Sequence, residues 1–207
     1  MLQRGALFVV SGFAGAGKGT IVKRIVSERK EMALSVSMTT RAPRPGEVDG
    51  REYFFVSKEE FEAAIEREEF LEYARYVDNC YGTPKNYVMS QLEKGRDVIL
   101  EIEVQGALQV KKKFPDVVLV FVTPPSGTVL CERLVNRGTE TAEVVKNRMH
   151  RALEESSYMS SYDFILVNDD LEKAVSDIKT IIDASHLTPR CNEVFISKIE
   201  EDLKAYK

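Results

Sequence analysis

The sequence of 207 residues has little of what marks several protein classes. Its three cysteines, Cys80, Cys131 and Cys191, are far apart and fit neither a disulfide framework nor the CxxC spacing of a metal site. No apolar run approaches the roughly 20 residues that span a bilayer. The run at residues 6–10 is too short for the apolar core of a signal peptide. We therefore expect a soluble, cytoplasmic protein.

Positive charge is not in excess either. The chain has 29 lysines and arginines against 33 acidic residues, a formal net charge of −4. It lacks the overall basic field that gathers nucleic acid, so we predict neither a nucleic-acid nor a membrane partner. A chain of this composition that binds a phosphorylated ligand must place its positive charge locally. Neither of the two histidines, His150 and His186, has a position that suggests a direct role.

Hydrophobic residues make up 43% of the chain, enough for one sizeable core. Short apolar runs typical of buried strands occur at residues 6–10, 97–102, 117–122 and 164–167. Segments with helical spacing follow them at residues 20–29, 105–114, 126–136 and 171–185. This alternation predicts an α/β fold of three layers with a central, mostly parallel sheet. The tail at residues 193–206 fits an amphipathic helix.

Two stretches interrupt the alternation. Residues 35–87 are polar and aromatic, and strands at 51–56 and 70–77 flank a helix at 58–68, for which Ser57 and Glu60 form a capping box. Residues 133–158 are highly charged and helical, with a break at Gly138-Thr139 that suggests a hinge. We predict one domain, residues 1–207, with a core (1–33, 88–125 and 159–207), an α/β insert (about 34–87) and a helical lid (about 126–158).

A G-x-x-x-x-G-K motif follows the first predicted strand and opens the first helix. Its glycines let backbone N–H groups turn inward around phosphate oxygens, and the helix N-terminus adds partial positive charge. Lys18 brings a point charge to the β and γ oxygens of a nucleotide. We predict that ATP is bound by Gly12, Phe13, Ala14, Gly15, Ala16, Gly17, Lys18, Gly19 and Thr20.

Gly19 stands where the general P-loop pattern has serine or threonine, and Thr20 comes next. The hydroxyl that holds Mg²⁺ in many P-loop proteins is therefore displaced. We expect Mg²⁺ as the cofactor, held mainly by nucleotide oxygens and water, with Thr20 or Glu103 as candidate protein ligands. The G-K-G-T form is similar to that of small nucleotide kinases.

A second phosphate site is suggested by Arg41 and Arg44, whose guanidinium groups can each donate two parallel hydrogen bonds to phosphate. Tyr53 and Tyr81 add neutral donors. Taken alone, two arginines in a proline-rich loop are more typical of a solvated surface, so the residues leave both interpretations open.

Several segments in order resemble the guanylate kinase signature. They are residues 35–47, 50–56, 70–74, 79–83 and 104–106, with the phosphate loop before them and Val167-Asn168-Asp169 after them. No single segment is specific, but their ordered occurrence is, and it covers almost the whole chain. The resemblance is to bacterial-type guanylate kinases, P-loop kinases of nucleoside monophosphates.

The resemblance implies that the insert binds GMP. The implied phosphate contacts are Arg41, Arg44, Tyr53 and Tyr81, and the implied base contacts are Ser37, Glu72, Thr83 and Glu101, with Gly82 and Glu103 in the same site. A carboxylate can accept from both N1–H and N2–H₂ of guanine, whereas adenine presents an acceptor at N1. The family usually has aspartate at positions 101 and 103 and commonly tyrosine at position 80, where this chain has Glu101, Glu103 and Cys80.

Paired arginines mark the predicted lid: Arg133 and Arg137 are four residues apart, and Arg148 and Arg151 are three apart. The charge pattern alone also fits solvated helix faces. The resemblance implies that Arg137 and Arg148 close over the triphosphate, with Arg133 near the adenine or its phosphates. It places Asn168 against adenine, although Asn168 also fits a helix cap before Leu171.

The implied activity is transfer of the γ-phosphoryl group of Mg·ATP to GMP, with dGMP as a slower substrate. We expect Lys18, Arg44, Arg137 and Arg148 to stabilise the transferring group. No general base is needed, because a phosphate oxygen is already a nucleophile. The alternative is an inactive guanylate kinase-like interaction module that binds phosphopeptides. The complete phosphate loop and the lid arginines favour the enzyme. Homo-oligomer formation is left open.

Overall fold

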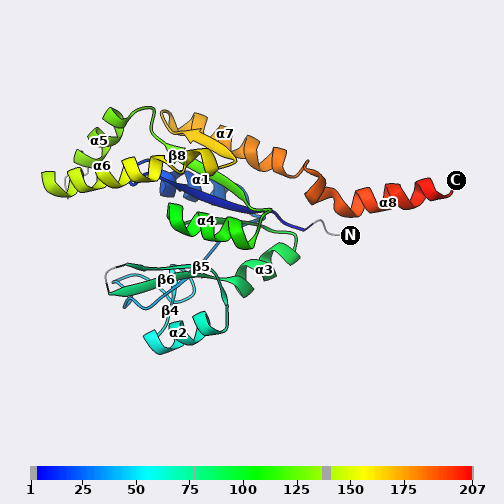
Figure 1. Ribbon diagram of the computed structural model, residues 1–207, viewed down its shortest axis with the longest axis horizontal. Helices are drawn as coiled ribbons and strands as arrows, with labels where there is room; N and C mark the ends of the chain where they lie inside the picture. Colours follow the sequence, from blue (N-terminus) through cyan, green and yellow to red (C-terminus); the bar gives the residue numbers. More distant parts are fainter. Residues whose placement is uncertain (1–3, 77, 137–140, 207) are drawn as a thin grey trace.

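The computed structural model describes residues 4–76, 78–136 and 141–206, and a five-stranded sheet lies at their centre (Figure 1). The strand order is β2–β7–β1–β8–β9, and each neighbouring pair is parallel. The strands are β1 (Leu7–Gly12), β2 (Met32–Leu34), β7 (Asp97–Glu101), β8 (Val118–Thr123) and β9 (Phe164–Val167). The predicted α/β fold with a parallel central sheet is confirmed.

Helices cover both faces of this sheet, and alternate residues of β1 show how. The helices are α1 (Lys18–Glu28), α3 (Lys85–Glu93), α4 (Val104–Lys113) and α7 (Leu171–Ser185). Phe8 and Val10 belong to the core shared with α1 and α7, whereas Leu7 and Val9 belong to the core shared with α3 and α4. Since strand side chains alternate between faces, the sheet lies between two helical layers.

A second sheet lies beside α4, on the side away from the central sheet (Figure 1). Its order is β4–β3–β6–β5, with β3 parallel to β4 and both other pairs antiparallel. The elements of this part are β3 (Ser37–Thr39), β4 (Tyr53–Phe55), α2 (Lys58–Glu66), β5 (Phe70–Tyr76) and β6 (Asn79–Pro84). Its small core is Phe61, Ala64 and Phe70, and Leu71 joins it to the core of the central sheet.

Two charged helices and a terminal helix complete the chain. They are α5 (Gly127–Val135), α6 (Ala142–Ser156) and α8 (Glu193–Lys204), with 3-10 turns at Met159–Ser161 and Pro189–Asn192. Helix α8 projects from the body of the molecule (Figure 1) and has no buried residue. The predicted break at Gly138-Thr139 lies outside the described residues. None of the described helices is long and apolar enough to span a membrane.

Most of the described helices and strands were predicted, and four were missed. The predicted capping box is confirmed, because the Glu60 N–H donates to Ser57 Oγ and the Ser57 N–H donates to Glu60 Oε2. Strands β2, β3 and β6 and helix α3 were not predicted. Two of these strands have three residues, too few to show a period, and α3 begins directly after Pro84. The division into core, insert and lid stays a prediction.

Gly82 yields a stability prediction, because stacked rings cover it. Phe61 and Phe70 stack with centroids 4.5 Å apart, and a Cβ at position 82 would lie 2.8 Å from a Phe70 ring atom. We expect Gly82→Ala to lower the free energy of unfolding by about 1–3 kcal/mol through overpacking. Gly127→Ala is the control, since its Cβ would meet no atom within 4 Å. Urea denaturation that finds the two variants equally stable would contradict this account.

Candidate functional site

The phosphate loop after β1 is folded so tightly that two of its glycines admit no side chain. Gly12 has φ 132° and Gly17 has φ 90°. A Cβ at Gly12 would lie 2.0 Å from the Val122 carbonyl oxygen, and one at Gly17 would lie 2.3 Å from Asn168 Nδ2. No side chain caps the start of α1, where Gly17 is the N-cap residue. The first N–H groups of this helix are thus suited to an anion.

Asn168 holds this loop from the end of β9. Its Nδ2 donates to the Ala16 carbonyl at 2.7 Å, its own N–H donates to the Thr123 carbonyl at 2.8 Å, and it is 8% exposed. The alternative role of Asn168 as a helix cap is wrong. Asp170 caps α7, since its Oδ1 accepts from the Lys173 N–H at 2.8 Å. The implied adenine contact of Asn168 stays a prediction.

Lys18 and Glu101 meet at the loop. Lys18 Nζ donates to the carbonyls of Gly12 (2.7 Å) and Phe13 (3.0 Å). The Glu101 carboxylate lies over the start of α1, 3.4 Å from where a Cβ on Gly19 would be. Desolvation there raises the pKa of Glu101, and the positive charges of Lys18 and Lys23 partly offset the rise. Glu101 therefore faces the phosphate loop.

Glu72 is the buried carboxylate of the second sheet, and it is 5% exposed. Thr83 Oγ1 donates to its Oε1 at 2.6 Å. A Cβ on Gly106 would lie 3.0 Å from its Oε2, so glycine at this position of α4 makes room for the carboxylate. Burial raises the pKa of Glu72, with the Thr83 hydrogen bond opposing the rise and the charge of Glu103 adding to it. Ionised Glu72 has acceptor capacity beyond the Thr83 hydroxyl.

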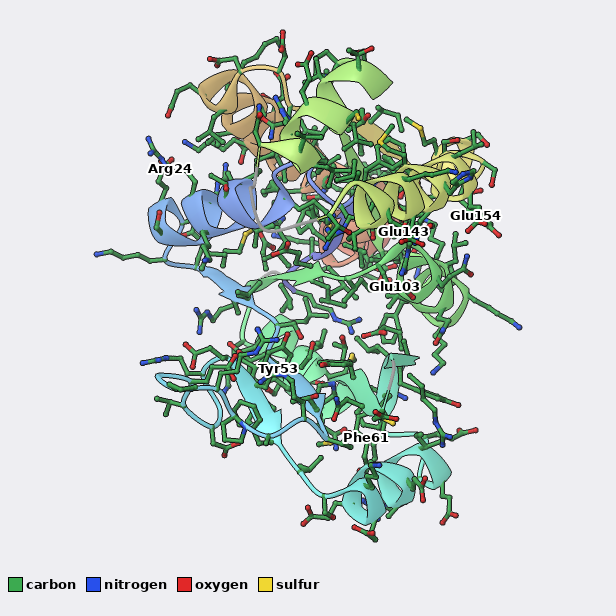
Figure 2. The ribbon with its side chains drawn as sticks, turned by 90° about the vertical axis from the view of Figure 1, so that its left-hand side faces the viewer. Arg24, Tyr53, Phe61, Glu103, Glu143 and Glu154 are labelled. Carbon is green, nitrogen blue, oxygen red and sulfur yellow. The ribbon has the colours of Figure 1, made fainter. Side chains whose placement is uncertain are left out.

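Glu103 is the N-cap residue of α4, and it forms an ion pair with helix α6 of the predicted lid. Arg151 Nη2 lies 2.9 Å from Glu103 Oε2, and Arg151 Nε lies 3.0 Å from Glu155 Oε1. This ion pair joins α6 to the start of α4. Glu103 is also close enough to Glu72 for its negative charge to raise the Glu72 pKa. Figure 2 shows Glu103 and Tyr53 on facing sides of the region between the two sheets.

A cavity of about 140 Å³ opens where the two sheets face each other. The second sheet and its loops contribute Ser37, Tyr53 and Thr83, and the end of β7 contributes Glu101. The structure thus brings together residues from four separate stretches of sequence, as the resemblance implied for one site.

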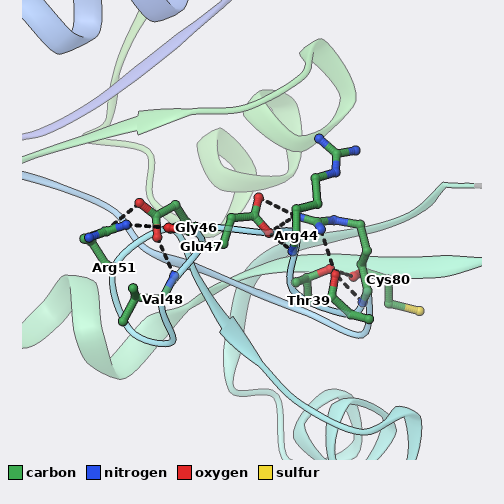
Figure 3. A network of polar contacts seen from close by, with 10 residues as sticks. Thr39, Arg44, Gly46, Glu47, Val48, Arg51 and Cys80 are labelled. Atoms are coloured by element: carbon green, nitrogen blue, oxygen red, sulfur yellow. Dashed lines mark hydrogen bonds and ion pairs between the residues drawn. The ribbon is translucent and has the colours of Figure 1, made fainter.

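The four residues implied for phosphate binding also gather in one place. The Arg41 guanidinium lies 5.4 Å from the Tyr53 ring centroid, and the rings of Tyr53 and Tyr81 are 6.0 Å apart. Burial raises the pKa of Tyr53 above its ordinary value of about 10, so its hydroxyl stays a neutral donor well beyond neutral pH. Arg41 and the backbone of Arg44 share a partner, Glu47 (Figure 3). Sequence reasoning gave Glu47 no role, although it lies in the signature segment.

The described arginines of the predicted lid lie on two helices that rest on the core. Arg133 is in the last turn of α5, whose Leu134 would lie 3.0 Å from a Cβ on Gly15. Arg148 is on α6, which packs through Val145 and Ala152. Arg137 lies outside the described residues. Within the described chain, no cluster of three or more His, Cys, Asp or Glu side chains is arranged to hold a metal ion.

Comparison with known proteins gives consistent matches. Residues 4–185 match the family model described as guanylate kinase. The chain is 51% identical over 200 residues to the guanylate kinase of Oceanobacillus iheyensis, covering 97% of each chain. It is 56% identical over 187 residues to that of Streptococcus thermophilus, covering 90% of each. The crystal structure of guanylate kinase from Anaplasma phagocytophilum superposes with a TM-score of 0.71 at 30% identity, covering 91% of this chain and 89% of that one.

The raised pKa of Glu72 predicts a pH-dependent stability. The folded state binds a proton at Glu72 more tightly than the unfolded state does, so this carboxylate lowers stability as pH rises above about 4.5. Glu72→Gln keeps an oxygen that can accept from Thr83 and carries no charge. We expect the variant, without ligand, to be more stable than the wild type at pH 7 and to lose that advantage near pH 4.

Urea denaturation between pH 4 and pH 7.5 measures this difference. Glu69→Gln is the control, because the hydrogen bond from Arg67 lowers the pKa of exposed Glu69 and the variant should gain nothing. A Glu72→Gln advantage that is the same at every pH would show that ionisation of Glu72 is not its cause.

Proposed function

Because the chain belongs to the guanylate kinase family, we propose that it transfers the γ-phosphoryl group of ATP to GMP with the groups that meet between its two sheets. One observation carries the assignment of roles. The cavity between the two sheets is lined by Tyr53 and Thr83 on one side and by Glu101 on the other. Glu101 lies over the phosphate loop, and Thr83 donates to buried Glu72. The similar chains bear the name of the enzyme, and nothing supports the alternative of an inactive interaction module.

On the donor side, the backbone N–H groups from Gly12 to Thr20 surround the phosphates of ATP, and Lys18 contacts the β and γ oxygens. Arg133, Arg137 and Arg148 approach from the lid. The hydrogen bond from Asn168 to Ala16 supports the role of the loop in binding phosphate, because it fixes the loop in the conformation that turns its N–H groups inward.

On the acceptor side, Arg41, Arg44, Tyr53 and Tyr81 bind the phosphate of GMP. Glu72 accepts from the guanine base, with Ser37 and Thr83 beside it. We assign the second acidic contact with the base to Glu103 rather than Glu101. The charge of Glu103 acts on Glu72, whereas Glu101 lies at the phosphate loop. dGMP is expected to be a slower acceptor.

The reaction needs alignment and charge neutralisation more than proton transfer. A phosphate oxygen of GMP attacks the γ-phosphorus, and the bond from that phosphorus to the bridging oxygen of ADP breaks, giving ADP and GDP. Lys18, Arg44, Arg137 and Arg148 balance the charge on the moving group. Closure of residues 126–158 as a lid would exclude water, which otherwise hydrolyses ATP.

Mg²⁺ fits this site as a cofactor bound mainly by the nucleotide and water. It would supply charge neutralisation at the phosphates. The Thr20 hydroxyl and the Glu101 carboxylate are hard oxygen donors at the loop, of the kind that Mg²⁺ prefers. Glu103 suits the ion less well, because Arg151 is bound to it. We also propose a cytoplasmic location and the division into core, insert and lid given above.

Lys18→Met tests the donor site. Removing the ammonium group should lower kcat at least about a hundredfold while the fold is retained, because this charge acts on the transferring group. Lys23→Met, on the exposed side of the same helix, should keep turnover within about twofold of the wild type. Turnover is measured with saturating ATP and GMP, and thermal denaturation checks the fold. Normal turnover of folded Lys18→Met would place the donor site elsewhere.

Glu72→Gln tests recognition of the base. Its amide presents a donor to one of the guanine donors, so one hydrogen bond to a charged acceptor is lost and kcat/KM for GMP should fall roughly ten- to 150-fold. Adenine has an N6 donor beside an N1 acceptor, which an amide can match, so AMP should lose nothing. Glu69→Gln is the control. Equal losses for GMP and AMP would mean that Glu72 does not read the base.

A further inference from the structure

A single turn brings one carboxylate to both of the arginines that we assign to the GMP phosphate. The Glu47 N–H donates to the Arg44 carbonyl at 3.0 Å across Pro45 and Gly46, and Gly46 has φ 88°. Proline followed by glycine at positive φ is the pattern of a type II turn. This turn folds the Glu47 side chain back over its own loop.

The Glu47 carboxylate has three hydrogen bonds there. Both of its oxygens lie 2.9 Å from Arg41 Nη2, and Oε2 accepts from the Arg44 N–H at 2.7 Å (Figure 3). The side chains of Arg41 and Glu47 are only 15% and 17% exposed, so water screens the pair weakly. The Arg41 hydrogen bond, followed by the one from Arg44, holds the pKa of Glu47 below its ordinary value.

Other contacts fix the remaining sides of Arg41. Its Nη1 donates to the Ala42 carbonyl at 2.8 Å, and its guanidinium lies over the rings of Tyr53 and Phe55 at 5.4 and 5.8 Å. Glu47 holds Arg44 differently, through the backbone alone. The Arg44 guanidinium extends away from Glu47 (Figure 3).

We propose that Glu47 is a positioning residue for acceptor binding: it orients Arg41 and the Arg44 backbone so that the phosphate of GMP meets a preformed site. The inference rests on the proposed function of these arginines. Two effects of Glu47 oppose each other, because its negative charge repels the phosphate while its hydrogen bonds fix a long, flexible side chain. Recognition of phosphate by a guanidinium depends on the orientation of its plane, which favours the second effect.

The geometry argues against Glu47 as a mere occupant of the phosphate site. A carboxylate in the place of the phosphate would bind both guanidinium groups. Glu47 instead binds one guanidinium and a backbone N–H, from a turn that includes Arg44 itself. It can therefore stay in place when a phosphate binds.

Glu47→Gln, compared with Glu69→Gln, tests the proposal. Glu69 also accepts two hydrogen bonds from an arginine, from Arg67 Nε at 2.7 Å and from Arg67 Nη2 at 3.0 Å. It is not among the residues that line the cavity between the two sheets. Glu47→Gln should raise KM and Kd for GMP about tenfold and change kcat and KM for ATP by less than about threefold. Glu69→Gln should leave all four values within about twofold.

A double-mutant cycle with Arg41→Gln separates orientation of Arg41 from general damage to the loop. In the Arg41→Gln background, Glu47→Gln should add less than about threefold to Kd for GMP, since the residue that it orients is gone. The full tenfold loss in that background, an unchanged Kd, or a lower Kd in the single variant would each overturn the proposal. Should Glu47→Gln fail to fold, Glu47→Asp, which is one methylene short of Arg41, should show the same direction of change.

Calorimetry of GMP binding without ATP, beside the kinetics, distinguishes this inference from the function on which it rests. A wild-type protein that neither binds nor phosphorylates GMP would overturn both. A wild-type protein that does both, with a Glu47→Gln variant that matches it, would overturn the positioning role alone.

Discussion

The close approach of the phosphate loop to its neighbours is the constraint on which the site depends. At Gly12 the backbone runs against the Val122 carbonyl, and at Gly17 against Asn168, so neither position has space for even a methyl group. The Asn168 amide then ties the loop to the ends of β8 and β9. With the loop fixed in this way, α1 starts at the carboxyl edge of the sheet. A second substrate must be presented at that same edge.

In the function that we propose, the second sheet meets this requirement. Charged groups on both parts of the molecule already have partners. Lys18 is bonded to carbonyls of its own loop, Arg41 to Glu47, and Arg151 to Glu103. In a chain of net charge −4, positive groups that gather at one place repel each other unless carboxylates and carbonyls lie among them. These partners also fix the directions of the three cationic side chains.

How much the sequence reveals depends on the distance along the chain between interacting groups. The phosphate loop, the capping box at Ser57 and the long periodic helices are local and could be predicted. The role of Asn168 could not, because its partner Ala16 is 152 positions away and the nearby Asp170 competes for the cap. The directions in which Glu101 and Glu103 point could not be predicted either, because the chain changes from strand β7 to helix α4 at these residues. Glu47 is an intermediate case. The Pro45-Gly46 pair indicates a turn, but the sequence does not show that this turn brings the Glu47 carboxylate to Arg41.

In the function that we propose, specificity for the base arises from the free-energy cost of burying Glu72 in the folded state. Burial makes ionised Glu72 unfavourable, and Thr83 satisfies only part of its capacity as an acceptor. A ligand with two adjacent donors relieves that cost, whereas one that presents an acceptor there adds repulsion between lone pairs. Gly106 keeps the carboxylate in this position by leaving space beside it. In the function that we propose, discrimination between guanine and adenine comes from this unsatisfied charge. A neutral residue at position 72 would then make the protein more stable and less able to distinguish the two bases.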